Sequence, residues 1–150
     1  MSANAPEVEI IDDQDHQTTV KIVGYFTAGT TSNTKLQANT FRGANTSINP
    51  CIISLVNFAY TTSMANGTVA LEWVGSSNVR IVSAGHNNDG ELKKYIPNSA
   101  AAPTGDVSIR IDNAMPNDSF TIIATFAKEL QGLSSTHAGA GAWANTQAQY

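Results

Sequence analysis

Residues 51–74 read CIISLVNFAYTTSMANGTVALEWV, two apolar runs with the pair Asn66-Gly67 between them. The first run, residues 51–60, is the most apolar stretch of the chain. The second, residues 68–74, alternates between apolar and polar positions, as a strand with one buried face does. An Asn-Gly pair between two strands favours a type I′ hairpin turn. The stretch therefore predicts two antiparallel strands, the second with Val69, Leu71 and Trp73 pointing into a core.

The same alternation predicts strands further along the chain. Residues 79–83 extend the hairpin into a meander, and Glu72, on the outward face, is placed to pair with Arg80 across it. Residues 107–111 and 120–126, separated by a turn at 115–118, predict a second hairpin.

The segment before residue 51 predicts at least two more strands. Residues 18–26 alternate, which places Val20, Ile22 and Phe26 on one face of a strand and Lys21, Val23 and Tyr25 on the other. Gly24 interrupts this strand and predicts a bulge. A loop is expected at residues 27–34 and a short strand at residues 36–41, because the first segment is rich in Gly, Thr, Ser and Asn.

About eight short strands with no amphipathic helix predict an all-β fold, an antiparallel β-sandwich or jelly roll. At 150 residues the chain is long enough for one such domain. We expect three parts: an extended acidic N-terminal arm at residues 1–17, the β-sandwich at 18–129, and a C-terminal tail at 130–150.

The expected arm is defined by its charge. Residues 1–15 hold five acids and no Lys or Arg, whereas the remaining 135 residues hold seven acids and eight bases. Like charges and little apolar surface oppose folding of such a segment alone, and a charged terminus often serves interaction. We expect the arm to dock on a partner or to add a strand to a neighbour's sheet, using Val8, Ile10, Ile11, Asp12 and Asp13.

The expected tail, LQGLSSTHAGAGAWANTQAQY, is rich in Gly, Ala, Ser and Gln and has no strand or helix period. Large aromatic side chains in such a segment are typical anchors in a partner's pocket. Trp143 and Tyr150 are therefore the second set of interface candidates.

Composition narrows the classes of partner. Charged residues make up 13% of the chain, about half the usual share, so part of the surface is expected to be covered by another protein. The net charge of −4 argues against a nucleic-acid partner. No apolar run approaches 18 residues, and the start lacks the basic and apolar regions of a signal peptide, so no membrane partner is expected. Cys51 is the single cysteine, which rules out an intramolecular disulfide.

The sequence predicts no enzyme, no cofactor and no metal site. His16, His86 and His137 lie far apart in the sequence, without the spacing of metal ligands. The serines lack the Gly-x-Ser-x-Gly pattern of a nucleophile elbow, and no carboxylate pair can be assigned.

The acidic arm up to about Gln17, the strands VKIVGYF and NGTVALEWVG, and the tail from Leu130 together resemble virion structural proteins of tailed bacteriophages. The resemblance is to capsid decoration (cement) proteins. It implies a non-enzymatic protein on the capsid surface of a virion, made in the host cytoplasm. It also implies contacts with the major capsid protein or other virion proteins and a homo-oligomer, often a trimer.

Two other classes stay open. A tail or fibre accessory protein would share the same organisation. A carbohydrate-binding, lectin-like jelly-roll module would instead stack sugars on aromatic side chains, for which the candidates are Tyr25, Tyr60, Trp73, Tyr95 and Trp143.

Overall fold

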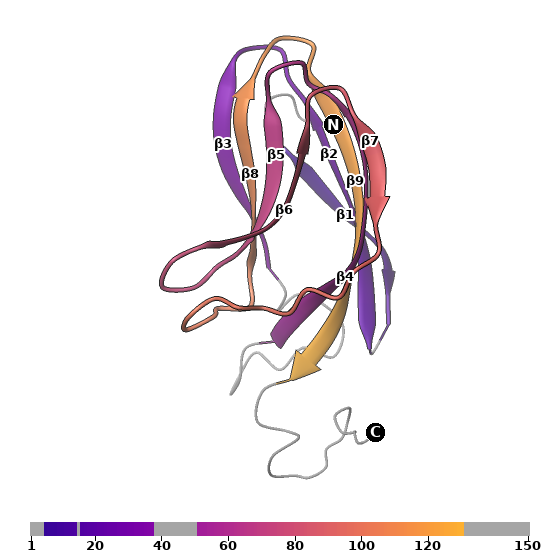
Figure 1. The fold of residues 1–150 in the computed structure, drawn as a ribbon, viewed down its shortest axis with the longest axis vertical. Coiled ribbons are helices and arrows are strands. Elements are labelled where there is room, and N and C mark those ends of the chain that lie inside the picture. The colour runs from indigo at the N-terminus through magenta and orange to yellow at the C-terminus, as the bar shows by residue number, and fades with distance from the viewer. Residues whose placement is uncertain (1–4, 15, 38–50, 131–150) are drawn as a thin grey trace.

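The computed structural model describes residues 5–14, 16–37 and 51–130. Within these residues, nine strands form two antiparallel sheets that face each other (Figure 1). The strands are β1 (Glu7–Asp13), β2 (Gln17–Tyr25), β3 (Thr30–Leu36), β4 (Cys51–Ser63), β5 (Thr68–Trp73), β6 (Val79–Gly85), β7 (Asp89–Leu92), β8 (Val107–Ala114) and β9 (Ser119–Leu130).

The strand order is that of a jelly roll. The five-stranded sheet has the order β1-β2-β9-β4-β7, and the four-stranded sheet has the order β3-β8-β5-β6. Without β1, two four-stranded sheets remain whose strands interleave along the chain, as eight-stranded jelly rolls do. The predicted all-β sandwich is confirmed, and β1 is an addition at one edge of it.

The core lies between the two sheets. Val20 and Ile22, which share one predicted face of β2, are fully buried, and so are the predicted inward side chains Val69, Leu71 and Trp73 of β5. The alternate side chains of β8 and β9 are buried too: Val107, Ile109, Ile111, Phe120, Ile122, Ala124 and Phe126. Trp73 of one sheet meets Phe126 of the other edge-on, with ring centroids 6.3 Å apart. Burying each large apolar side chain contributes roughly 1.5–3 kcal/mol, so this layer supplies most of the stabilisation.

The predicted pairing of Glu72 with Arg80 is confirmed. Their Cα atoms are cross-strand partners on β5 and β6, and Arg80 Nε lies 3.3 Å from Glu72 Oε2. Asn78 also donates to the Glu72 carboxylate. Glu72 is nevertheless buried, because these neighbours cover it on the outer face of the sheet.

The predicted hairpin turns at Asn66-Gly67 and at 115–118 are wrong, because each joins strands of different sheets. The first carries the chain from β4 to β5 and the second from β8 to β9. Neither Asn66 nor Gly67 has the positive φ of a type I′ turn. A Cβ on Gly67 would lie 2.8 Å from Met64 Cε, so glycine serves close packing there. The predicted meander reduces to the β5–β6 hairpin.

The expectation that residues 1–17 form an arm outside the sandwich is wrong for residues 7–13. These residues are β1, which pairs antiparallel with β2. Val8 lies opposite the buried Ile22 and packs against the core. The physical reason is that Glu7 and Glu9 flank Val8, so Val8 can pack against the core while the two glutamates stay exposed on the other face.

An ion pair anchors the end of β1. Lys128, near the end of β9, is almost fully buried, and its Nζ lies 2.7 Å from Asp13 Oδ1. The same carboxylate oxygen accepts a hydrogen bond from Thr18 Oγ1 at 2.7 Å. Lys128 Nζ also donates to the Gln14 carbonyl. This contact joins β1, β2 and β9.

Two local predictions before residue 51 are corrected. Residues 30–34, expected in a loop, belong to β3, because threonine-rich segments pair well when a partner strand is present, here β8. The strand expected at 36–41 ends at Leu36 as part of β3, and residues 38–41 lie outside the described residues.

Gly24 marks no bulge, because β2 and β9 stay in register through the pair Gly24 and Phe120. A Cβ at this position would lie 2.2 Å from Phe120 Cε2, so the buried ring occupies the space of a side chain.

Gly24→Ala is expected to lower the free energy of unfolding by about 1–3 kcal/mol, because the Phe120 ring must leave its packed position. Urea denaturation measures the change. Gly29→Ala is the matched control and should be nearly neutral, since its Cβ would meet only the Ala114 carbonyl at 3.6 Å. In a Phe120→Leu background, Gly24→Ala should cost much less stability, because the smaller side chain leaves room for the new Cβ. Equal losses for both alanine variants would contradict the packing argument.

Candidate binding surface

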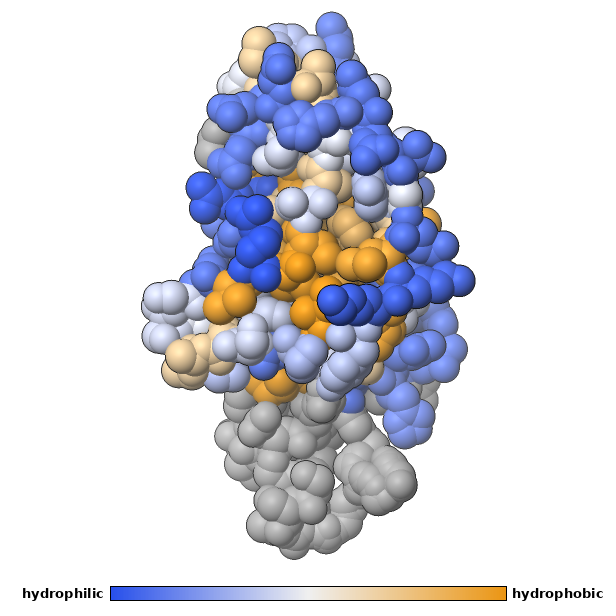
Figure 2. Space-filling model, viewed as in Figure 1, coloured by the Kyte–Doolittle hydropathy of each residue, from blue (hydrophilic) through white to orange (hydrophobic). Residues whose placement is uncertain are grey.

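One side of the sandwich, between the edge strands β6 and β7, leaves part of the core accessible. In the view of Figure 1 these two strands lie toward the viewer, one from each sheet. Figure 2, from the same viewpoint, shows apolar side chains gathered in the middle of this face. Five aliphatic or aromatic side chains that pack against the core are only partly buried here, namely Tyr60, Val79, Ile81, Val82 and Ile96.

A cleft of about 300 Å³ lies on this side, between the sheets. Its apolar walls come from both sheets: Phe58, Tyr60 and Leu92 from one, and Val82 from the other. Phe58 and Tyr60 pack with ring centroids 5.2 Å apart. Leu92 is 37% exposed, an accessible aliphatic side chain at the mouth. These accessible apolar side chains make the surface a candidate for contact with another molecule. We call this surface the β6–β7 side.

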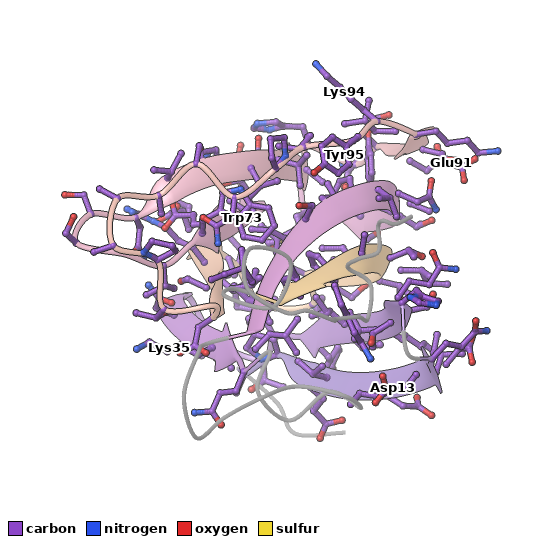
Figure 3. All side chains as sticks on the ribbon, turned by 90° about the horizontal axis from the view of Figure 1, so that it is seen from below. Asp13, Lys35, Trp73, Glu91, Lys94 and Tyr95 are labelled. Carbon is purple, nitrogen blue, oxygen red and sulfur yellow. The ribbon has the colours of Figure 1, made fainter. Side chains whose placement is uncertain are left out.

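Charged residues border the β6–β7 side along β7. Glu91 and Ser83 contribute to the lining of the cleft, while Lys93 and Lys94 follow Leu92 directly and are exposed. Figure 3 shows Lys94 projecting away from the body of the molecule, near Glu91 and Tyr95. The chain then returns to β4, where Ile96 and Leu55 exchange backbone hydrogen bonds of 2.8 and 2.9 Å. An acid and two bases thus stand next to an apolar cleft.

A second exposed apolar surface lies on β1, at the opposite edge of the five-stranded sheet. Ile10 is 41% exposed and Ile11 is 51% exposed. The pairing of β1 with β2 shifts between Ile10 and Asp12, which leaves Ile11 as an extra residue. Bulges at a sheet edge hinder further strand pairing, so side chains rather than backbone are what this edge offers a partner.

The residues that the sequence proposed for an interface therefore differ in their exposure and contacts. Ile10 and Ile11 are exposed on β1, whereas Val8 packs against the core. Asp13 is engaged with Lys128, and Asp12 accepts a hydrogen bond from Gln14 Nε2 at 2.8 Å. Trp143 and Tyr150 lie outside the described residues, and β9 extends to Leu130, where the tail was expected to begin.

The aromatic candidates for sugar stacking do not form a platform together. Trp73 is fully buried between the sheets and points into the interior (Figure 3). Tyr60 lines the cleft edge beside Phe58. Tyr25 and Tyr95 are exposed, but Tyr25 ends β2 and Tyr95 follows β7, which are separated by β9 and β4 in the sheet.

The described residues contain no group of three His, Cys, Asp or Glu side chains that could hold a metal ion. His86 lies in the turn before β7, where Nδ1 is 3.4 Å from the Ala65 carbonyl oxygen. Burial raises the pKa of the Asp106 carboxyl above its ordinary value, and the charge of Lys35 opposes this. A single carboxyl group with a raised pKa does not make a general acid–base pair.

The sequence did not reveal the β6–β7 side. Residues 89–94, DGELKK, contain a single large apolar residue, which is too few to show a strand period or a buried face. One sequence feature could have indicated it: Leu92 stands between two acids and two bases at the end of a turn-rich segment.

None of the described segments is a helix long and apolar enough to cross a membrane.

Comparisons with known proteins give no family assignment. No protein-family model matches the chain, and no curated protein matches it significantly. Among solved structures, a carbohydrate-binding module, CBM4, has 9% identity and a TM-score of 0.35, covering 81% of this chain and 78% of that one. TmCBM61, solved with β-1,4-galactotriose, has 10% identity and a TM-score of 0.35, covering 85% and 90%. The infectious bursal disease virus Gx strain structure has 15% identity and a TM-score of 0.32, covering 87% of this chain and 33% of that one. At these scores the likenesses carry no weight for function.

Proposed function

We propose that this protein is a non-catalytic virion structural protein that binds the outside of a phage capsid and stabilises it by contacts between subunits. The observation that carries the proposal is that apolar side chains are exposed at both edges of the five-stranded sheet: Ile10 and Ile11 on β1, and Leu92 beside the cleft. A protein that links neighbouring subunits needs two contact surfaces, and repetition over a shell lets each contact be modest.

The chemistry of these surfaces favours protein partners. Their accessible side chains are mainly aliphatic, which suits apolar contacts with another protein. Sugar recognition instead requires accessible aromatic faces with hydrogen-bonding groups around them. The carbohydrate-binding alternative retains one supporting feature. A hollow of about 360 Å³ on the outer face of the five-stranded sheet is lined by Thr61, Thr121, Asp89 and Glu91, among others.

Particle binding tests the proposal. Purified particles that lack the protein are incubated with the wild-type chain or with Ile10→Ser/Ile11→Ser, and the copies bound per particle are counted by quantitative mass spectrometry. We expect saturable binding of the wild type and at least about tenfold weaker binding of the variant, because two exposed apolar contacts are lost. Met115→Ser is the matched control, since Met115 is equally exposed (51%) in the β8–β9 connection.

Two outcomes would contradict the proposal. Absence of wild-type binding to any particle, combined with specific binding on a glycan array, would establish the carbohydrate-binding alternative. Equal binding by the β1 variant and the wild type would remove β1 from the contact surface.

A further inference from the structure

We propose that the β6–β7 side is a two-fold interface between two copies of this chain, in which residues 90–94, the end of β7 and the two lysines after it, pair antiparallel with the same residues of the other copy. The inference deepens the proposed function, since it names the occupant of one of its two contact surfaces. The contact requires only the protein itself, so it can be tested without a particle.

β7 is an edge strand of the five-stranded sheet. Its four residues, Asp89–Leu92, are all exposed, and within the described part of the chain β7 pairs only with β4. The other side of an edge strand presents backbone donors and acceptors that can pair with another strand. The pairing of β7 with β4 has no register shift, unlike the pairing of β1 with β2 at the opposite edge.

The charges on either side of Leu92 favour contact between two copies of the chain. The segment DGELKK, residues 89–94, carries its acids before Leu92 and its bases after it. Antiparallel pairing of two such segments about Leu92 places Glu91 of one copy opposite Lys93 of the other, and a two-fold axis repeats the pair. Opposite charges in cross-strand positions are stabilising, and like charges are destabilising. The segment is therefore complementary to itself.

The same charges disfavour the main alternative geometry. Head-to-tail contact of β7 with β1 of the next copy would set Asp89 and Glu91 against the acidic strand EVEIIDD. Such a heterologous contact would be needed for a ring such as a trimer, or for a filament. A two-fold contact avoids this repulsion.

Apolar side chains lie beside the proposed axis. Leu92, Val82 and Tyr60 lie at the cleft, and β6 forms its other lip. When residues 90–94 of the two copies pair, the two clefts face each other across the axis. The side chains at both clefts then become buried in the interface. Burial of apolar area then supplies affinity, and the charged pairs select the register.

Sedimentation equilibrium on the purified full chain tests the contact. The wild type is expected to dimerise. Glu91→Lys places Lys opposite Lys, and Lys93→Glu places Glu opposite Glu, so each variant alone should dimerise at least about tenfold more weakly. An equimolar mixture of the two variants should restore dimers, because each then meets its opposite charge. Glu91→Lys/Lys93→Glu in one chain should restore the homodimer.

A matched control changes the same charge at the other edge. Glu9→Lys on β1 should leave the dimer unchanged, because Glu9 lies away from the axis. Circular dichroism verifies that every variant is folded. A wild type that is monomeric at all concentrations, or trimeric, overturns the two-fold contact, and so does a mixture that fails to restore dimers. A monomer that still binds particles would overturn only this contact, whereas a dimer that binds no particle would overturn only the proposed function.

Discussion

Asp13→Ala is expected to lower the free energy of unfolding by about 3 kcal/mol, the largest effect of any single charged residue on β1. The Lys128 side chain is 1% exposed, and its Nζ lies 2.7 Å from Asp13 Oδ1. Removing the carboxylate leaves the Lys128 ammonium group buried without its charged partner. The Gln14 carbonyl and other contacts replace only part of the lost hydration. The expected loss of about 3 kcal/mol is the low end of the range for removing one partner of a buried ion pair, because Asp13 is itself 23% exposed.

Chemical denaturation of three variants isolates this effect. Asp12→Ala is the matched control: it removes an exposed acid from the adjacent position of β1 and should cost less than about 0.5 kcal/mol. Asp13→Ala/Lys128→Met should recover most of the lost stability, because a buried pair replaced by apolar groups is often neutral. A loss below about 1 kcal/mol for Asp13→Ala, or no recovery in the double variant, would show that the pair does not anchor β1.

This anchor changes how the N-terminal segment must be studied. Truncation before residue 16 would remove Asp13 together with the whole of β1, and would expose the edge of β2. A loss of particle binding after such a truncation would therefore mix instability with a lost contact. The exposed pair Ile10 and Ile11 allows the contact to be tested with the anchor in place.

The sequence was most informative about which side chains face the core. Alternation in β2 and β5 predicted the buried faces correctly, because period 2 is a direct consequence of strand geometry. It did not predict which strands are neighbours. The runs on either side of Asn66-Gly67 face each other across the core, and that arrangement produces the same alternation as side-by-side pairing.

The prediction of an extended arm at the N-terminus was wrong because it relied on charge and not on alternation. The five acids before residue 16 dominated the composition, while Val8 and Ile10 at alternate positions carried the strand signal. The partner of Asp13 is 115 residues away in the chain, so no local pattern could reveal it. The β6–β7 side was likewise invisible, because its exposure depends on two edge strands of different sheets.

Trp73→Ala is expected to lower the free energy of unfolding by about 3–5 kcal/mol, the usual range for removing a large aromatic side chain from a core. Trp73 is fully buried, and it joins the two sheets through its edge-on contact with Phe126. Trp73→Phe should cost much less, about 1 kcal/mol. It leaves a smaller cavity, and it removes an indole Nε1 that has no hydrogen-bond partner among the described residues.

The same variants separate a structural role for this tryptophan from a role in sugar binding. If Trp73 were a stacking platform, its loss would abolish glycan binding and leave the unfolding midpoint unchanged. Burial between the sheets predicts the opposite, a large fall in stability measured by guanidinium denaturation. Tyr25→Ala is the comparison, because an aromatic side chain that is 38% exposed at the end of β2 should cost less than about 1 kcal/mol. A wild-type-like midpoint for Trp73→Ala would mean that the ring can leave the core, and would restore it as a candidate for ligand contact.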